Sequence, residues 1–340
     1  MPGTIFALGF SHWKKRPLRA ALQGSRVRFV RDLRTLPQGA TVAIWGLPGT
    51  QPEQRPDLHW LHVEDGFLRS VGLGAELTRP LSWVVDRRGL YYDATKPSDL
   101  EVLLETTEFP PADLARAAAF RAAITGAGLT KYNADREHWH RPPEAERVVL
   151  VPGQVESDAS LRFGTADTRT NYQLVCAARA ACPGAFLVYK PHPDVQAGLR
   201  AVGPDEGKIA ALVDAVVSNV DMHQLLGQVD EVHVLTSLTG FEALLRGKPV
   251  TCHGQPFYSG WGLTRDLAPV PRRARKRSLD ELVAGALLQY PCYFDRQARR
   301  VSPEQALQAL LEWRATAHAR PAAWWRPLWR SLLRRIVGVR

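Results

Sequence analysis

The segment TSLTGFEALLRGKPV (236–250) places Ser237, Thr239 and Gly240 at the expected start of a helix, with Glu242 one turn further. Backbone N–H groups and hydroxyls at a helix N-terminus converge on an anion such as a phosphate. The same Ser/Thr turn also suits an ordinary N-cap, so capping and anion binding both stay open. The glycine spacing is not that of a Walker A loop.

A second segment, YKPHPDV (189–195), follows an expected strand and holds Lys190 and His192 between two prolines. The prolines stiffen the loop and fix the positions of a cation and an imidazole. Lys190 could neutralise a phosphate or a carboxylate, and His192 could donate a hydrogen bond to a phosphate oxygen of a leaving group. A loop with a purely structural role is the alternative.

A third segment, VPGQVESDAS (151–160), presents Gln154 and Asp158 after another expected strand. The carboxylate of Asp158 could serve as a nucleophile or a base. Because serines flank it, Asp158 could equally be the N-cap of the following helix.

In the fourth segment, HVEDGFLRS (62–70), Glu64 and Asp65 are adjacent and Arg69 follows. Neighbouring side chains on an extended chain point to opposite faces, so we expect one carboxylate to face a cleft. That carboxylate is a candidate general base. The other would hold the loop or pair with Arg69.

The elements that must position these residues alternate along the chain. The first half has apolar runs typical of strands and one helical pattern, at 4–10, 26–30, 41–46, 60–66 and 111–128. The second half predicts strands at 148–153, 185–193, 215–220 and 231–237, with helices at 171–182 and 221–229. Strands alternating with helices imply parallel βαβ units, whose functional loops lie at the carboxyl ends of the strands. We therefore predict an α/β fold.

The polar segment 131–146 is the expected linker between two Rossmann-like domains, 1–140 and 147–315. A third region, the tail 318–340, is basic. Residues 320–340 contain six arginines and no acidic residue, so the rest of the chain accounts for only +4 of the net charge of +10. This concentration of charge disfavours a general nucleic-acid-binding protein.

The tail places Trp325, Trp329, Leu332 and Ile336 at helical spacing, with arginines displaced by one position. Such a segment suits an anionic membrane surface. A terminal helix packed on the first domain is the alternative, and the two stay open.

Other features exclude whole classes of protein. The four cysteines form no CxxC pair and have no histidine at zinc-ligand spacing, so we predict neither a metal site nor disulfides. No DxD, GxGxxG, HExxH or GxSxG motif occurs, which disfavours metal-dependent sugar transfer, dinucleotide chemistry and serine hydrolysis. The N-terminus lacks the pattern of a secretory signal and no long apolar run follows, so we expect a cytoplasmic protein.

Six motifs taken together resemble the capsule β-Kdo transferases of the KpsC type, over about residues 5 to 310. These motifs, in the family's order, are GFSHWKKRPL (9–18), the segment 63–93, GQVESDAS (153–160), YKPHPDV (189–195), TSLTGFEALLRGKPV (236–250) and PFYSGWGLTRD (256–266). KpsC proteins usually carry two such modules, whereas this sequence has one. The resemblance implies a GT-B-like fold, with the two Rossmann-like domains facing a central cleft and the first domain on the acceptor side.

The resemblance also implies chemistry. The donor would be CMP-β-Kdo, the acceptor a lipid-linked capsule glycan, and the β configuration would be retained without an obligatory metal or cofactor. Carried over to this sequence, Asp158 looks like the nucleophile and Glu64 or Asp65 like the acid/base. The residues that look like the CMP-binding set are Lys190, His192, Ser237, Thr239 and Glu242. We add Gln154, Arg69 and Gly240 to the expected substrate-binding residues.

Three other functions stay open. An inverting CMP-sialic-acid-type transferase would share the donor site but lack a nucleophile. A non-catalytic capsule assembly or export protein would keep the fold and release no CMP. A nucleic-acid binder is the weakest alternative. As partners we expect the CMP-sugar, the lipid-linked acceptor, the inner face of the inner membrane through the tail, and other capsule assembly proteins.

Overall fold

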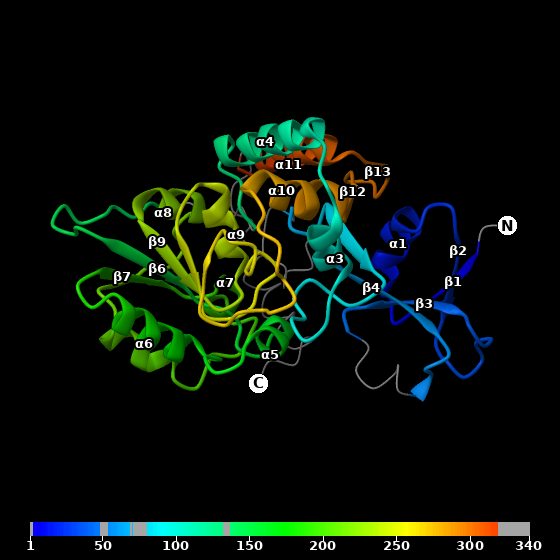
Figure 1. The fold of residues 1–340 in the computed structure, drawn as a ribbon, viewed down its shortest axis with the longest axis horizontal. Helices are drawn as coiled ribbons and strands as arrows, with labels where there is room; N and C mark the ends of the chain where they lie inside the picture. The colour runs from blue at the N-terminus through cyan, green and yellow to red at the C-terminus, as the bar shows by residue number, and fades with distance from the viewer. Residues whose placement is uncertain (1–2, 48–53, 69, 71–79, 132–136, 319–340) are drawn as a thin grey trace.

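The computed structural model describes residues 3–47, 54–68, 70, 80–131 and 137–318. Within these ranges two β-sheets form two lobes, with helices packed around each (Figure 1). The predicted α/β fold with two layered sheets is confirmed. The predicted strands match observed ones to within a few residues at their ends, because the apolar runs continue into the turns that follow.

The second sheet is built from parallel strands, as predicted. In spatial order these are β11 (Arg265–Asp266), β10 (Val250–Cys252), β9 (Glu231–Val234), β6 (Val148–Pro152), β7 (Phe186–Lys190) and β8 (Ala215–Val216). The central strand β6 is buried on both faces, since Val148 and Leu150 join one hydrophobic core and Val149 and Val151 join another. A strand covered on both faces reads as a continuous apolar run.

Helices pack on both faces of this second sheet (Figure 1). One face packs against α6 (Asn171–Ala181), and the other against α8 (Met222–Gln228) and α9 (Leu238–Leu245). The short helices α5 (Ala159–Gly164) and α7 (Pro193–Gln196) follow β6 and β7. Because the strands are parallel, the loops after β6, β7 and β9 all emerge at one edge of the sheet.

The first sheet has mixed direction. Its order is β13 (Arg300–Val301), β12 (Pro291–Phe294), β5 (Ser82–Asp86), β4 (His59–Asp65), β3 (Thr41–Trp45), β1 (Thr4–Leu8) and β2 (Arg26–Val30). The four strands from β4 to β2 are parallel, while β5, β12 and β13 run antiparallel to their neighbours. Helix α1 (Lys15–Ala21) follows β1 and buries Leu18.

The segment 291–301 lies inside the range predicted for the second domain, 147–315, yet it pairs with the first sheet. Strand β12 lies antiparallel to β5, with Cys292 opposite Trp83. The rings of Trp83 and Phe294 are 5.8 Å apart in an edge-to-face arrangement. Without this pairing β5 would be an exposed sheet edge, which explains why the chain returns to the first domain.

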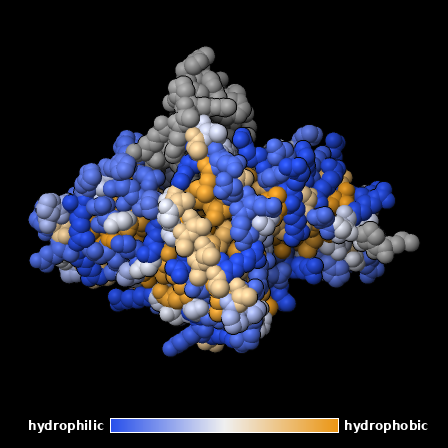
Figure 2. Space-filling view, turned by 90° about the horizontal axis from the view of Figure 1, so that it is seen from above, coloured by the Kyte–Doolittle hydropathy of each residue, from blue (hydrophilic) through white to orange (hydrophobic). Residues whose placement is uncertain are grey.

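A layer of helices joins the lobes. It contains α3 (Asp99–Thr106), α4 (Pro111–Gly126), α10 (Leu279–Val283), which a π-helical turn extends, and α11 (Pro303–His318). Helix α4 packs on α10 and pairs with α11 through Arg116 and Glu304, 2.7 Å apart. Figure 2 looks down onto this layer and shows an apolar band across the middle, between hydrophilic lobes.

Buried ion pairs fix one lobe against the other. Glu101 of α3 is 6% exposed and accepts hydrogen bonds from Arg272 and from Arg273, whose Nε lies 2.9 Å away. Both arginines belong to the segment between β11 and α10. Moving the lobes apart would separate Glu101 from these arginines and leave its buried charge uncompensated. The ion pairs therefore hold the two lobes in one arrangement.

No helix in the described ranges combines the length and apolar character that crossing a membrane requires. Residues 319–340, which make up nearly all of the predicted tail, lie outside the described residues. The membrane-surface and packing interpretations of the tail therefore both stay predictions.

Candidate active site

The two lobes enclose a cavity of about 1890 Å³, its open mouth included. Glu64 and Asp65 line it from the end of β4, and Asp158 lines it from the loop between β6 and α5. The predicted catalytic residues, which come from different domains, are thus brought together. The cavity also has His192 and Ser237 on its wall.

A second, narrower pocket adjoins this cavity, with about 590 Å³ of space when the solvent at its mouth is included. It contains five predicted donor-binding residues: Lys190, His192, Ser237, Thr239 and Glu242. The two hollows share Lys131, His192, Ser237 and Leu238, so they form one continuous site. On the side of the second domain its walls come from the carboxyl ends of β6, β7 and β9, as the parallel sheet predicts.

The ring of His192 has a defined orientation. His192 is the N-cap of α7, and its Nδ1 accepts a hydrogen bond of 3.2 Å from the backbone N–H of Asp194. Because Nδ1 is the acceptor, a neutral ring carries its proton on Nε2. Nε2 is therefore the donor nitrogen. Lys190, two residues earlier at the end of β7, is only 4% exposed and lines the adjoining pocket.

The N-terminus of α9 is capped by a side chain and also faces the pocket. Ser237 is the N-cap, and its Oγ accepts a hydrogen bond of 3.2 Å from the backbone N–H of Thr239. Both residues also line the pocket. A capped helix start that faces a pocket presents its remaining N–H groups to an anion.

Glu242 lies inside α9 and is 7% exposed. One carboxylate oxygen accepts a hydrogen bond of 2.6 Å from the backbone N–H of Lys131, which ties the interdomain linker to the pocket. Burial raises the pKa of Glu242 to about 7, against the opposing effect of the Arg246 charge. Glu242 thus helps to shape the pocket by holding Lys131 in place.

Gln154 and Gly240 have packing partners that the sequence did not indicate. The Gln154 amide bridges to Thr236, accepting from its backbone N–H at 2.9 Å and donating to its Oγ1 at 3.0 Å. This joins the loops after β6 and β9 beside the cavity. Gly240 lies outside the lining of both hollows, and a β-carbon there would be 2.3 Å from the hydroxyl of Tyr258. Close packing explains the glycine.

Asp158 does not use its side chain as a cap. It precedes α5, but its carboxylate makes no capping hydrogen bond. The side chain is 43% exposed, and an Nη of Arg200 lies 3.9 Å from its carboxylate. The carboxylate is therefore accessible from the cavity, as a nucleophile must be.

Glu64 and Asp65 both line the cavity, and the expectation that only one of their carboxylates faces it stays a prediction. Both residues lie within β4, where Glu64 is opposite Val84 and Asp65 is opposite Trp83 of β5. In addition, Oε1 of Glu64 accepts a hydrogen bond of 2.9 Å from the backbone N–H of Asp65, which bends the Glu64 side chain along the chain. Arg69, the predicted partner of these carboxylates, lies outside the described residues.

Several cavity residues were not assigned roles from the sequence. Trp13, Lys14, Trp45, Tyr92 and Arg200 all line the cavity. The Nζ of Lys14 lies 3.1 Å from the ring centroid of Trp45, a cation–π contact on the wall of the first domain. The motif 9–18 includes Trp13 and Lys14 and the segment 63–93 includes Tyr92, but neither motif assigned these residues a role.

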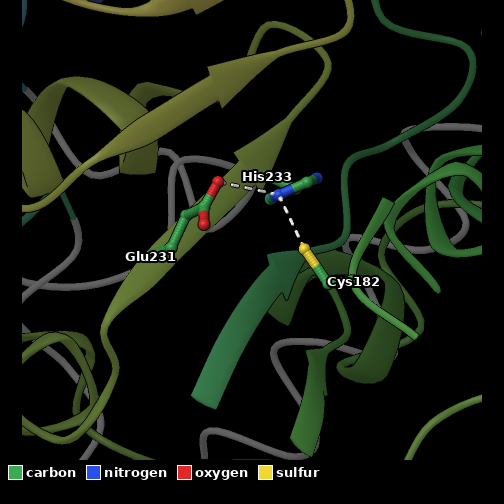
Figure 3. Close-up of side chains that lie close together, drawn as sticks. All are labelled: Cys182, Glu231 and His233. Atoms are coloured by element: carbon green, nitrogen blue, oxygen red, sulfur yellow. Dashed lines mark hydrogen bonds and ion pairs between the residues drawn. The ribbon is translucent and has the colours of Figure 1, made fainter. Parts of the chain in front are cut away.

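Among the described residues, one group could offer three metal ligands: Cys182, Glu231 and His233, whose ligand atoms lie within 4.8 Å of one another (Figure 3). Hydrogen bonds already occupy this group. His233 Nε2 is 3.0 Å from Glu231, and its Nδ1 is 3.1 Å from Nε2 of His253. Glu231 also accepts from Thr251 and Arg147. We assign the group a structural role in tying β9 to its neighbours.

This network predicts an acid-sensitive contribution to stability. The hydrogen bond from His233 is the main cause that lowers the pKa of Glu231 from 4.5 to about 2. A lowered pKa stabilises the fold above pH 4.5 and loses that effect as the pH falls toward 2. We expect Glu231→Gln to flatten the plot of the free energy of unfolding against pH in this window. The slope should fall by at most the value that corresponds to one bound proton. Urea titrations from pH 6 to pH 2.5 measure it, and equal slopes in both proteins would contradict the assignment.

Comparisons with known proteins agree with this geometry. The family model described as "Capsule polysaccharide biosynthesis protein" matches residues 50–125 and 117–294. The chain is 38% identical over 322 residues to the capsule polysaccharide modification protein LipA of Neisseria meningitidis serogroup A, covering 91% of this chain and 46% of LipA. It is 40% identical over 307 residues to the lipopolysaccharide-processing protein LpsZ of Rhizobium meliloti, covering 85% of this chain and 70% of LpsZ. The chain thus spans about half the length of LipA.

Two solved structures are similar over nearly their whole length. Thermosulfurimonas dismutans KpsC, beta Kdo 2,7 transferase, is 37% identical with a TM-score of 0.74, covering 91% of this chain and 99% of that one. The beta Kdo 2,4 transferase of the same KpsC is 33% identical with a TM-score of 0.76, covering 92% and 98%. The GT-B-like architecture is confirmed by these matches. The chain belongs to the capsule polysaccharide biosynthesis protein family, in its KpsC-type branch.

Proposed function

We propose that the chain is a retaining glycosyltransferase that moves β-Kdo from CMP-β-Kdo to a lipid-linked capsule glycan. The observation that carries the proposal is that Asp158 lines the same cavity as Glu64 and Asp65, next to the pocket of Lys190 and His192. The similarity to two modules named as β-Kdo transferases supports the choice of sugar.

In the first displacement a carboxylate oxygen of Asp158 bonds to the anomeric carbon. The bond from that carbon to the CMP phosphate breaks, and its electron pair leaves with the phosphate. The ammonium of Lys190 and the Nε2–H of His192 stabilise the charge on the departing phosphate. The departing CMP requires stabilisation of its phosphate charge more than it requires a proton. In this mechanism Lys190 and His192 provide that stabilisation, and no metal is obligatory.

In the second displacement an acceptor hydroxyl oxygen bonds to the same carbon. The ester bond to Asp158 breaks, its electrons return to the carboxylate, and the hydroxyl proton passes to Glu64 or Asp65. Two inversions at one carbon retain the β configuration. Glu64 and Asp65 both reach the cavity, so either carboxylate can take the proton.

We place this reaction at the cytoplasmic face of the inner membrane, in contact with other capsule assembly proteins. The proposal is supported by the lipid-linked acceptor that the reaction needs and by the tryptophans and arginines of 324–340. Nucleic acid is not an expected partner.

The test is to incubate the protein with CMP-β-Kdo and a synthetic Kdo-terminated glycolipid, with and without EDTA. We expect CMP release that EDTA does not abolish, and NMR of the product should show a β linkage. An α-linked product would instead indicate an inverting transferase. Absence of CMP release would indicate a non-catalytic protein.

A further inference from the structure

Tyr92 lies in the cavity that carboxylates of both domains line. It lines the same cavity as Glu64 and Asp158. A β-carbon built on Gly46 would lie 3.7 Å from the Tyr92 hydroxyl and 3.8 Å from Oε2 of Glu64. The hydroxyl and the carboxylate thus approach the same point above Gly46, at the end of β3.

Backbone hydrogen bonds to the second domain also fix the position of Tyr92. The segment after Tyr92 is fastened to α5, because the N–H of Ala94 donates to the carbonyl of Phe163 at 3.2 Å. The same helix begins directly after Asp158, whose carbonyl accepts from the N–H of Leu161 at 3.1 Å. Tyr92 is therefore tied to the helix that positions the predicted nucleophile.

The hydroxyl of Tyr92 has no acceptor among the described residues, in contrast to its neighbour. Tyr91 donates to the backbone carbonyl of Asp65 at 3.1 Å. Burial, together with the charges of Glu64, Asp93 and Asp158, raises the pKa of Tyr92. The phenol therefore keeps its proton throughout the working pH range and acts as a donor, not as a base or a nucleophile.

We propose that Tyr92 contacts the substrate by donating a hydrogen bond to the carboxylate of the sugar in transit. This inference rests on the proposed function, in which the transferred sugar is an acid. Such a sugar enters a cavity that Asp158 and Glu64 both line, and like charges repel. A neutral donor in the same cavity offsets that repulsion without forming an ion pair with either carboxylate.

The test compares Tyr92→Phe with Tyr172→Phe, which removes a hydroxyl from α6 outside both hollows. A hydrogen bond to a charged group contributes about 1.5–3 kcal/mol, which corresponds to a loss of roughly 10- to 150-fold. We expect kcat/KM for CMP-β-Kdo to fall by that factor in Tyr92→Phe, with an unchanged melting temperature, and to stay at the wild-type value in Tyr172→Phe.

A second measurement separates this inference from the proposed function. Free Kdo is titrated into wild type and both variants by NMR, and we expect roughly tenfold weaker binding to Tyr92→Phe alone. Tyr92→Phe that keeps both kcat/KM and Kdo affinity within twofold of wild type overturns the role of Tyr92. A wild-type protein that binds Kdo but releases no CMP contradicts the proposed function. In that case the affinities of wild type and Tyr92→Phe for free Kdo still test whether Tyr92 binds the sugar.

Discussion

Asp158→Ala is expected to lower kcat by about 10⁴-fold or more, because the variant has no oxygen to bond to the anomeric carbon. Asp158→Asn should be equally inactive, since an amide is a poor nucleophile of nearly the same size. The exposed side chain makes no capping hydrogen bond, so both variants should keep the wild-type melting temperature. CMP release with CMP-β-Kdo and the Kdo-terminated glycolipid measures the effect.

Asp167→Asn is the matched control for these variants. It removes another exposed carboxylate, shortly after α5, that lines neither hollow. We expect it to keep wild-type activity. Full turnover by Asp158→Ala would remove the nucleophile from the mechanism and leave only a front-side or an inverting reaction.

His192→Ala is expected to have the second largest effect, a fall in kcat/KM of about 10²- to 10³-fold, since the Nε2–H would no longer stabilise the leaving phosphate. Alanine also removes the cap of α7. His192→Asn distinguishes the two effects, because the asparagine oxygen can still accept from the N–H of Asp194. We expect this variant to recover the melting temperature but not the rate. Recovery of the wild-type rate would mean that His192 is only a cap.

The sequence predicted the parallel sheet and the edge at which its loops meet. Strands buried on both faces, such as β6, leave a continuous apolar run that is easy to recognise. The polar residues following β6, β7 and β9 therefore had to lie close together, and Asp158, His192 and Ser237 do. Their roles in the reaction stay predictions, since geometry alone does not measure a rate.

Other features depend on tertiary contacts that no short pattern contains. The pairing of β12 with β5 joins residues about 200 apart in the sequence. Glu64 and Asp65 are the last two residues of β4, and element ends are poorly defined by sequence. Gly240 resembled a binding residue, but the reason for it is the Tyr258 hydroxyl, from a separate segment. Tyr92 lies in the motif 63–93, but its place in the cavity beside Glu64 and Asp158 depends on tertiary contacts.

The central claim is that a carboxylate of this chain forms a covalent bond to the sugar. Incubating wild type and Glu64→Gln with CMP-β-Kdo in the absence of acceptor, followed by intact mass spectrometry and peptide mapping, tests it most directly. We predict an added mass of one Kdo residue on the peptide that contains Asp158, and no such mass in Asp158→Ala. An adduct that maps to another residue, or that persists in Asp158→Ala, would contradict it.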